Sequence, residues 1–445
     1  MGVQIPLDIQ PGVSAGKNET NRLYPGDRAA HDWYRFILSF PPHLVRTYLE
    51  QFGADTRHTV LDPFCGTGTT LVECCKLGIS TIGIEAVPMP YFATSVKVDW
   101  VPQPARLLAH ASEIAESALV ALERDGVPDI PYKNVSANGH HLRALPELQI
   151  RLLLKDSISP LPLHKALVLR DSIEDFRNDH YYRHERLALA KAIVASISNL
   201  RFGPEVGVGQ IKADTPVVAT WLAEIRAMAK DLEQLQRLPI PRAIVHSADS
   251  RDLLCLLPPN SIDFVITSPP YPNEKDYTRT TRLESVLLGL IQDRKSLQQL
   301  KRKLVRSNTR NVYKGDDDDR WVEHFPKIQH IAKAIEKRRL ELGKTSGFER
   351  LYPKVTKLYF GGMARHLSDL RGVLRPEAQL AYVVGDQASY LQVMIHTGQI
   401  LAEIAESLGY EIVSIDLFRS RVATVTRHQL REEVVVLRWP GKRES

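Results

Sequence analysis

The chain has 445 residues, of which 43% are hydrophobic and 25% charged, with a formal net charge of +6; this balance is typical of a folded globular protein and compatible with a polyanionic partner. The sequence contains no apolar run of about 18 residues, and its first residues lack the basic and apolar regions of a secretory signal, so we expect neither a membrane span nor export. The 4 cysteines are too few and too unevenly spaced for a disulfide framework or a zinc site, which favours a reducing cytoplasm.

Short apolar runs alternate with helical patterns along much of the chain. The first expected strand, 60–64, leads through a glycine turn into a helix over 69–78, which Gly78 should close. Strands alternating with helices predict an α/β fold with a doubly wound, mostly parallel sheet. The expected strands are residues 60–64, 81–85, 243–249, 261–271, 379–386, 411–418 and 432–439.

Two long segments interrupt this alternation and exceed the usual length of a crossover connection. Residues 101–240 carry helical patterns such as RLALAKAIVASI, and residues 291–352 form a basic helical stretch. Both are interpreted as helical insertions. The predicted organisation is an N-terminal extension (1–30), a first half of the sheet domain (31–100), the first insertion (101–240), a second half (241–290), the basic insertion (291–352) and a C-terminal part of the sheet (353–445).

The stretch VLDPFCGTGTT (60–70) has the order of a nucleotide-binding site: a strand, a glycine turn and a helix. Gly66 and Gly68 are expected to let a ligand approach the backbone where a Cβ atom would collide. Glu85, at the end of the second strand, is placed to accept both hydroxyls of a ribose. Asp249, at the end of the third strand, is placed to contact an adenine amino group.

Two other nucleotide sites fit this stretch poorly. A phosphate-binding P-loop needs a lysine after its last glycine, whereas Thr69 and Thr70 follow Gly68. A dinucleotide site favours glycine or alanine where Leu71 stands. S-adenosylmethionine has no phosphate and needs neither feature, so it is the predicted cofactor.

The stretch ITSPPYPNEKDYT (266–278) ends the fourth strand with two prolines and an aromatic ring. The prolines remove backbone donors, which leaves the Ser268 hydroxyl and the Pro269 carbonyl as acceptors for a substrate amino group. Tyr271 would stack on a base swung out of a duplex. A methyltransferase acting on a ring carbon needs a cysteine nucleophile, and Cys65 lies in the glycine turn instead. The alternative is a tight loop without chemistry.

Together these motifs resemble the amino-methyltransferase family of DNA methylases, which modify cytosine N4 or adenine N6. DPFCGTGTT (62–70) is similar to the family's cofactor motif, TSPPY (267–271) to its catalytic motif, and residues 31–52 to the segment that covers the methionine part of the cofactor. The resemblance implies a Rossmann-like S-adenosylmethionine-dependent methyltransferase fold, double-stranded DNA as substrate, a cognate restriction endonuclease as partner, and a bacterial or archaeal cytosol. It assigns cofactor contacts to Phe40, Pro41, Asp62, Pro63, Phe64, Gly66, Gly68, Thr69, Thr70, Glu85 and Asp249, and catalysis to Ser268, Pro269, Pro270 and Tyr271.

Serine at position 268 resembles the cytosine-N4 branch, with adenine N6 as the alternative on the same scaffold. An RNA methylase and a catalytically silent nucleic-acid-binding protein are more distant alternatives. The cofactor motif precedes the catalytic motif here, which is the less common order in the family. Which insertion recognises the target sequence therefore stays open.

Several charged stretches bear on DNA binding. Basic residues between positions 293 and 344 favour either a grip on phosphates or a solvated helix face. The segment NDHYYRHER (178–186) is typical of a helix start with packed tyrosines, and reaching base edges is the alternative. We expect no metal site: the four aspartates at 316–319 are interpreted as a solvated loop, and His140-His141 as surface polar residues.

Overall fold

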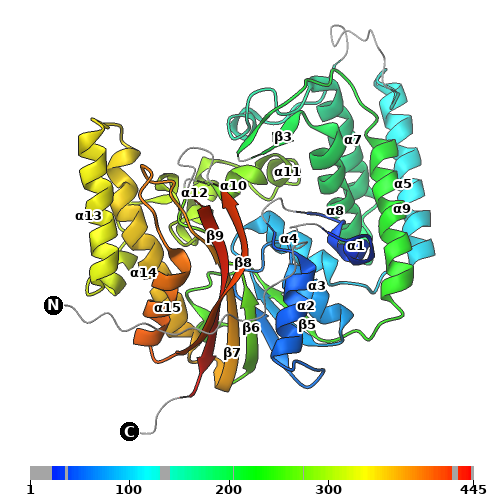
Figure 1. The fold of residues 1–445 in the computed structure, drawn as a ribbon. Helices are drawn as coiled ribbons and strands as arrows, with labels where there is room; N and C mark the ends of the chain where they lie inside the picture. The colour runs from blue at the N-terminus through cyan, green and yellow to red at the C-terminus, as the bar shows by residue number, and fades with distance from the viewer. Residues whose placement is uncertain are drawn as a thin grey trace, which may run out of the picture.

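The computed structural model describes residues 23–441 apart from 36–38, 131–140, 204, 274 and 423–428. Seven strands form one sheet in the order β5-β2-β1-β6-β7-β9-β8 (Figure 1). The pairs among β5, β2, β1, β6 and β7 are parallel, whereas β9 runs antiparallel to both of its neighbours, β7 and β8. The mostly parallel α/β sheet predicted from the sequence is confirmed. The strands are β1 (Thr59–Asp62), β2 (Ser80–Ile84), β5 (Ala243–His246), β6 (Ile262–Thr267), β7 (Leu374–Gly385), β8 (Glu411–Val422) and β9 (Gln429–Trp439).

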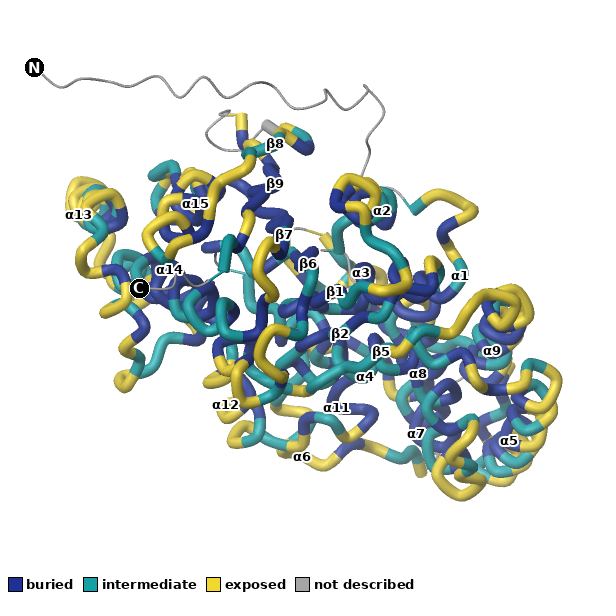
Figure 2. The backbone as a smooth tube through the Cα atoms, turned by 90° about the horizontal axis from the view of Figure 1, so that it is seen from below, coloured by how far each residue is buried: buried dark blue, intermediate teal, exposed yellow. Residues whose placement is uncertain are grey.

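Helices cover both faces of this sheet, and alternate side chains of each central strand face opposite layers. In β6, Phe264 and Ile266 pack with α2 (Pro42–Gln51) and with Cys74 of α3 (Thr69–Lys76). Val265 faces the opposite layer, formed by α14 (Tyr352–Leu370) and α15 (Thr397–Ser407). Because both faces are covered, the central strands are largely buried, whereas exposed residues gather on outer helices such as α13 (Pro326–Glu341) (Figure 2).

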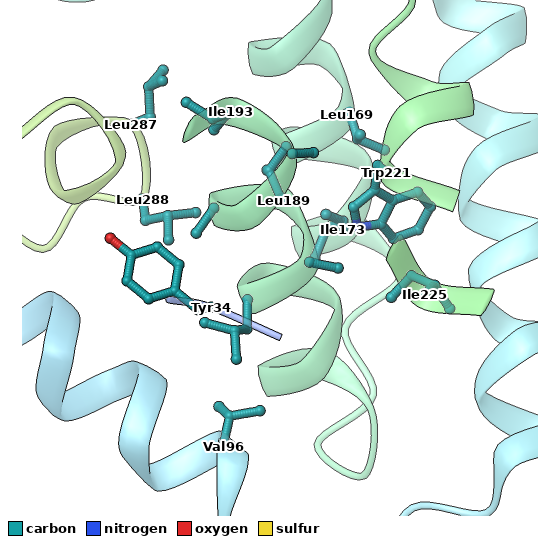
Figure 3. Close-up of a cluster of buried hydrophobic side chains, with 14 of the residues drawn as sticks. Tyr34, Val96, Leu169, Ile173, Leu189, Ile193, Trp221, Ile225, Leu287 and Leu288 are labelled. Carbon is teal, nitrogen blue, oxygen red and sulfur yellow. The ribbon is translucent and has the colours of Figure 1, made fainter. Parts of the chain in front are cut away.

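The first insertion contributes four long helices that lie together beside the sheet (Figure 1). They share one core with α4 (Pro88–Lys97) and α11 (Arg282–Leu287), and this core contains Leu189 and Trp221 together with Val96 and Leu287 (Figure 3). The four helices are α5 (Pro104–Arg124), α7 (Pro160–Asp175), α8 (Tyr182–Ala192) and α9 (Val218–Leu235). A short hairpin, β3 (Leu200–Phe202) with β4 (Val206–Val208), connects α8 to α9.

The segment NDHYYRHER does form a helix start. Tyr182 begins α8, is 9% exposed, and lies under the guanidinium groups of Arg177 and Arg186. The interpretation of a helix start with a packed tyrosine is confirmed. Throughout the described ranges, no helix combines the length and the apolar character needed to cross a membrane.

The second insertion consists of α12 (Arg294–Arg302), α13 and the short 3-10 helices η4 (Thr309–Asn311) and η5 (Asp318–Val322). Here the prediction of a solvated aspartate loop is wrong for Asp316 and Asp318, whereas Asp317 is exposed as expected. Asp316 accepts two hydrogen bonds of 2.8 Å from Arg306, and Asp318 is 6% exposed and bonded to Arg251. Each of these two carboxylates is neutralised by an arginine, so Asp316 and Asp318 are structural. The expectation for His140-His141 lies partly outside the described residues.

Candidate active site

The glycine turn and the proline loop lie at the same edge of the sheet. Their strands β1 and β6 are parallel neighbours, with Val60 paired to Phe264. Two side chains join the loops directly: Thr267 Oγ1 donates to Asp62 Oδ1 at 2.6 Å, and Thr70 Oγ1 donates to the Ile266 carbonyl at 3.1 Å. The two motifs therefore face one region at the carboxyl ends of the strands, where open α/β sheets hold their ligands.

A cavity of about 850 Å³ opens at this edge. Its size suits a cofactor together with part of a substrate. Four predicted residues do not line it: Asp62, Gly68, Thr70 and Asp249. The predicted residues that do are Phe40, Pro41, Pro63, Phe64, Gly66, Thr69, Glu85, Ser268, Pro269, Pro270 and Tyr271.

The two glycines of the turn serve different purposes. Gly66 has φ +52° and faces open space at the cavity, and its amide donates to Glu85 Oε2 at 3.0 Å. Gly68 has φ +81°, and a Cβ atom there would lie 2.7 Å from Thr94 Cγ2. The expectation of close ligand approach fits Gly66 only, because Gly68 is required by backbone conformation and by packing against α4.

Glu85 follows β2 directly and is fixed by two backbone donors. Besides Gly66, the Val87 amide donates to Glu85 Oε1 at 2.6 Å. Burial raises the pKa of the Glu85 carboxyl to about 7 despite these hydrogen bonds. An added hydroxyl donor would favour its ionised form.

Asp62 lies behind the turn and is fully buried. Its Oδ1 atom also accepts from the Phe64 amide at 3.1 Å, and its Oδ2 atom has no hydrogen-bond partner among the described residues. Burial raises the pKa of Asp62 to about 6. Asp62 thus holds the two loops together from below the cavity.

Asp249 is placed differently from the sequence prediction. The third strand ends at His246, and the Asp249 carboxylate is bound by the Arg251 guanidinium, with Nη2 to Oδ2 at 2.6 Å. The neighbours Ala248 and Ser250 line the cavity instead. Contact between Asp249 and an adenine stays a prediction.

The proline loop is held by hydrogen bonds on both sides. Ser268 Oγ donates to the Val383 carbonyl at 3.0 Å, so its hydrogen is engaged and its lone pairs remain available. The Tyr271 amide donates to Tyr277 Oη at 3.3 Å, and the Tyr271 ring packs against Gly385, where a Cβ atom would lie 3.1 Å from Cε2. Burial raises the pKa of the Tyr271 hydroxyl, which is therefore protonated at neutral pH.

One residue that supports the glycine turn was not predicted from the sequence. Lys97 ends α4, is 1% exposed, and its Nζ atom donates to the Thr67 carbonyl in the glycine turn at 2.6 Å. Burial lowers its pKa to about 7. The sequence feature that could have predicted the burial of Lys97 is its position three residues after Thr94 and four after Ala93. This spacing places Lys97 on the buried face of α4.

The cations of the basic insertion are of two kinds: some are paired with carboxylates, and others are exposed to solvent. Lys301 Nζ binds Asp276 at 2.6 Å, and Arg306 binds Asp316, so both are structural. Lys303 is exposed at the cavity, and Arg294, Lys295, Arg302 and Arg310 are also exposed. Across the described part of the chain, no group of three or more His, Cys, Asp or Glu residues is arranged to hold a metal ion.

The sheet order, with a glycine turn and an acid on adjacent strand ends, defines a Rossmann-like methyltransferase fold. Residues 14–89 match the family described as DNA methylase. This match supports the resemblance to the amino-methyltransferase family of DNA methylases and supports DNA methyltransferase activity.

Individual relatives agree with this placement. The chain is 26% identical over 450 residues to the Type II methyltransferase M.BsoBI of Geobacillus stearothermophilus, which covers 93% of this chain and 84% of that protein. It is 25% identical over 440 residues to the Type II methyltransferase M.AvaI of Nostoc sp., with coverages of 92% and 86%. Among solved structures, TrmN from Thermus thermophilus aligns with 10% identity and a TM-score of 0.30, over 93% of this chain and 52% of that chain; a likeness this low adds nothing to the assignment.

Proposed function

We propose that this enzyme transfers a methyl group from S-adenosylmethionine to the N4 amine of a cytosine extruded from duplex DNA. The observation that carries the proposal is the hydrogen bonding of the Ser268 hydroxyl. Its hydroxyl hydrogen is engaged by Val383, and its lone pairs are left to accept a hydrogen from an amine in the cavity. Serine at this position also resembles the cytosine-N4 branch of the family.

The cofactor half of the cavity fits S-adenosylmethionine. Gly66 leaves open space beside its backbone, and Glu85 offers a carboxylate to ribose hydroxyls. Phe40, Pro41 and Phe64 supply apolar surface for the remainder of the cofactor. Bound there, the cofactor supplies an electrophilic methyl group on a sulfonium.

The chain's own residues then position the amine. Ser268 Oγ and the Pro269 carbonyl accept its two hydrogens, which favours a pyramidal nitrogen with its lone pair directed at the methyl group. The N–CH₃ bond forms as the donor's S–CH₃ bond breaks, and the methylated amine releases one proton to solvent. Tyr271 and Pro270 form the wall against which the base rests. Catalysis is therefore mainly a matter of orientation.

DNA recognition is assigned to the two insertions. Lys303 lines the cavity, and this residue and the other exposed cations of residues 291–352 suit contacts to phosphates. Residues 101–240 are the candidate for target recognition. Because relatives are named Type II methyltransferases, the protein is also proposed to act in the cytoplasm alongside a cognate restriction endonuclease.

The test is expression in a methylation-free bacterial strain, followed by hydrolysis of the DNA and methylation-sensitive sequencing. N4-methylcytosine at one recurrent sequence is the expected result. N6-methyladenine without N4-methylcytosine would assign the adenine branch on the same scaffold. Binding of S-adenosylmethionine with no modified base in DNA would contradict the proposed activity.

A further inference from the structure

A short hairpin over residues 387–395 follows β7, at the same edge of the sheet as the proline loop. Its arms are joined where Gln387 and Ile395 exchange backbone hydrogen bonds of 3.0 and 2.7 Å. Tyr390 attaches the hairpin to the basic insertion, because its Oη atom donates to the Ser307 carbonyl at 2.8 Å. The hairpin is therefore a fixed part of the cavity wall. The hairpin residues that line the cavity are Gln387, Ala388, Ser389, Leu391 and Gln392.

The turn of this hairpin has an unusual backbone. The Val393 amide donates to the Tyr390 carbonyl at 3.1 Å. The two residues between them are Leu391, with φ +53°, and Gln392, with φ +65°. Positive φ at both central positions defines a type I′ turn, which favours asparagine and glycine because other side chains adopt this conformation only at a cost in free energy. An interaction outside the turn must therefore favour leucine and glutamine here.

Packing accounts for the first of these two residues and not for the second. Leu391 is partly buried and packs against the core of the layer formed by α14 and α15. Gln392 is exposed, and its carboxamide makes no hydrogen bond with any residue that the structure describes. Glycine would suit this backbone better, and no contact within the described fold offsets the difference. The partner of Gln392 is therefore expected among the ligands of the cavity.

We propose that the carboxamide of Gln392 recognises the edge of an adenine that stays in the duplex next to the extruded cytosine; this inference rests on the proposed function. A carboxamide presents a donor and an acceptor side by side. In the major groove, the N6 amine and the N7 atom of adenine present the matching pair, and glutamine contacts adenine in this way. Gln392 thus determines part of the target sequence.

The order of the strands places Gln392 on the DNA side of the cavity. The residues proposed to hold the cofactor follow β1 and β2 or precede α2. The proline loop follows β6 and the hairpin follows β7, one strand further from β1, and neighbouring strands lie about 4.8 Å apart. Gln392 is also exposed, whereas Ser268 is partly buried. A base that stays in the duplex would therefore meet Gln392 while the extruded base reaches Ser268.

Two substitutions separate recognition from backbone strain. Gln392→Gly removes the side chain and relieves the strain, so its melting temperature should not fall. Gln392→Glu keeps the strained backbone and replaces the amide donor with a second oxygen. Both variants should lower kcat/KM for the target DNA by roughly 10-fold or more, with the dissociation constant of S-adenosylmethionine unchanged within about twofold.

Specificity is measured with duplexes that differ at the positions flanking the methylated cytosine. For the unaltered enzyme, exchange of the recognised adenine pair should lower kcat/KM by roughly 10-fold or more. Both variants should methylate the original and the exchanged duplex at similar rates, because they have already lost the contact. Methylation-sensitive sequencing after expression in a methylation-free strain should show the same relaxation at that one position. Relaxation only at a position that is not adenine would overturn the assignment.

Asn260 provides a matched control. It is also an exposed carboxamide with positive φ, +49°, but it lies two residues before β6, at the opposite edge of the sheet. Asn260→Gly should therefore leave kcat/KM and the methylated sequence unchanged. Relaxed specificity in this control would show that a change in any surface turn is sufficient, and would overturn the role of Gln392.

The remaining outcomes separate this inference from the proposed function. Unchanged discrimination in both Gln392 variants would overturn the role of Gln392 while leaving methyl transfer in place. An equal fall in kcat/KM on every duplex would assign the side chain to a phosphate, and weaker cofactor binding would assign it to the cofactor; either result would also overturn the inference. Absence of methyl transfer by the unaltered enzyme would instead contradict the proposed function.

Discussion

Thr267 Oγ1 donates a 2.6 Å hydrogen bond to the buried Oδ1 atom of Asp62, and this bond connects the start of the proline loop to the start of the glycine turn. The two residues are 205 positions apart in the chain. This buried contact, together with the bond from Thr70 to the Ile266 carbonyl, therefore helps to fix the relative placement of the two loops.

Thr267→Val keeps the shape of the side chain and removes this donor. We expect the free energy of unfolding to fall by about 2 kcal/mol at neutral pH, because a buried carboxylate loses a hydrogen bond. Urea unfolding measures this change. The control is Thr356→Val, because the Thr356 hydroxyl donates to the Tyr352 carbonyl within its own helix. An equally large fall in the free energy of unfolding of this control would show that the contact with Asp62 does not contribute more than an ordinary hydroxyl contact.

Ser268→Ala tests the acceptor assigned to the amine. Loss of one hydrogen bond that matters in the transition state should slow methyl transfer by roughly 100-fold, with cofactor affinity near normal. Single-turnover rates and calorimetric titration measure the two quantities. Ser285 of α11 is buried and donates to the Thr281 carbonyl just before that helix, so Ser285→Ala is the matched control. Unchanged transfer by Ser268→Ala would refute the role of this hydroxyl.

The sequence alone was sufficient to predict the sheet and the proximity of the glycine turn and the proline loop. Each strand is a short apolar run between turn residues, and the carboxyl ends of parallel neighbours lie at one edge, so Gly66 and Ser268 had to approach the same region. The helix after the turn also ends as predicted: the Ile79 amide bonds to the Cys74 carbonyl at 2.9 Å, and Gly78 has φ +72°.

Other features depend on partners that are distant in the chain and leave no local signal. Gly68 is needed because of Thr94, and Arg251, which holds the nearby Asp249, also binds Asp318, 67 residues further on. The aspartates at 316–319 therefore looked solvated, because local sequence reasoning does not reveal which arginines approach them. Which arginine pairs with which aspartate across an insertion is decided by the tertiary structure and not by the local sequence.

Cofactor affinity should depend on pH through Glu85. Its pKa of about 7 lies above the ordinary 4.5, so the folded chain holds the proton between these values and loses stability as pH rises through them. Ribose hydroxyls bind the ionised carboxylate, so S-adenosylmethionine should bind more tightly as pH rises from about 6 to about 8. Glu85→Gln should bind roughly 10-fold more weakly and without this pH dependence.

A second buried acid provides the control for that experiment. Burial also raises the pKa of Glu284 to about 7, but Glu284 bonds to Tyr34 and does not line the cavity. Glu284→Gln should therefore keep the pH dependence of cofactor binding seen in the unaltered enzyme. If it abolished the dependence, the titrating group would not be Glu85. Calorimetric titration across this pH range measures both variants.

Lys97 should make stability rise with pH in the alkaline range. Its pKa is about 7 in the folded chain and 10.5 when unperturbed, so between these values the unfolded chain binds the extra proton and unfolding becomes less favourable as pH rises. From about pH 7 to about pH 9 the stability of the unaltered enzyme should increase by about 2 kcal/mol relative to Lys97→Met. Urea unfolding at both pH values measures it, and parallel curves for the two proteins would contradict the assignment.

Gly361→Ala should detach η5 from α14. A Cβ atom at Gly361 would lie 1.8 Å from the Asp318 carbonyl oxygen. Because this oxygen belongs to the backbone, it cannot move aside as the end of a flexible side chain can. We expect a loss of about 3 kcal/mol in the free energy of unfolding and faster proteolysis at residues 316–322, because Arg251 loses its Asp318 partner. Gly347 is exposed with nothing within 4 Å of an added Cβ atom, so Gly347→Ala should change stability by less than about 0.5 kcal/mol. Equal stability of the two variants would show that the close contact between η5 and α14 does not hold the basic insertion in place.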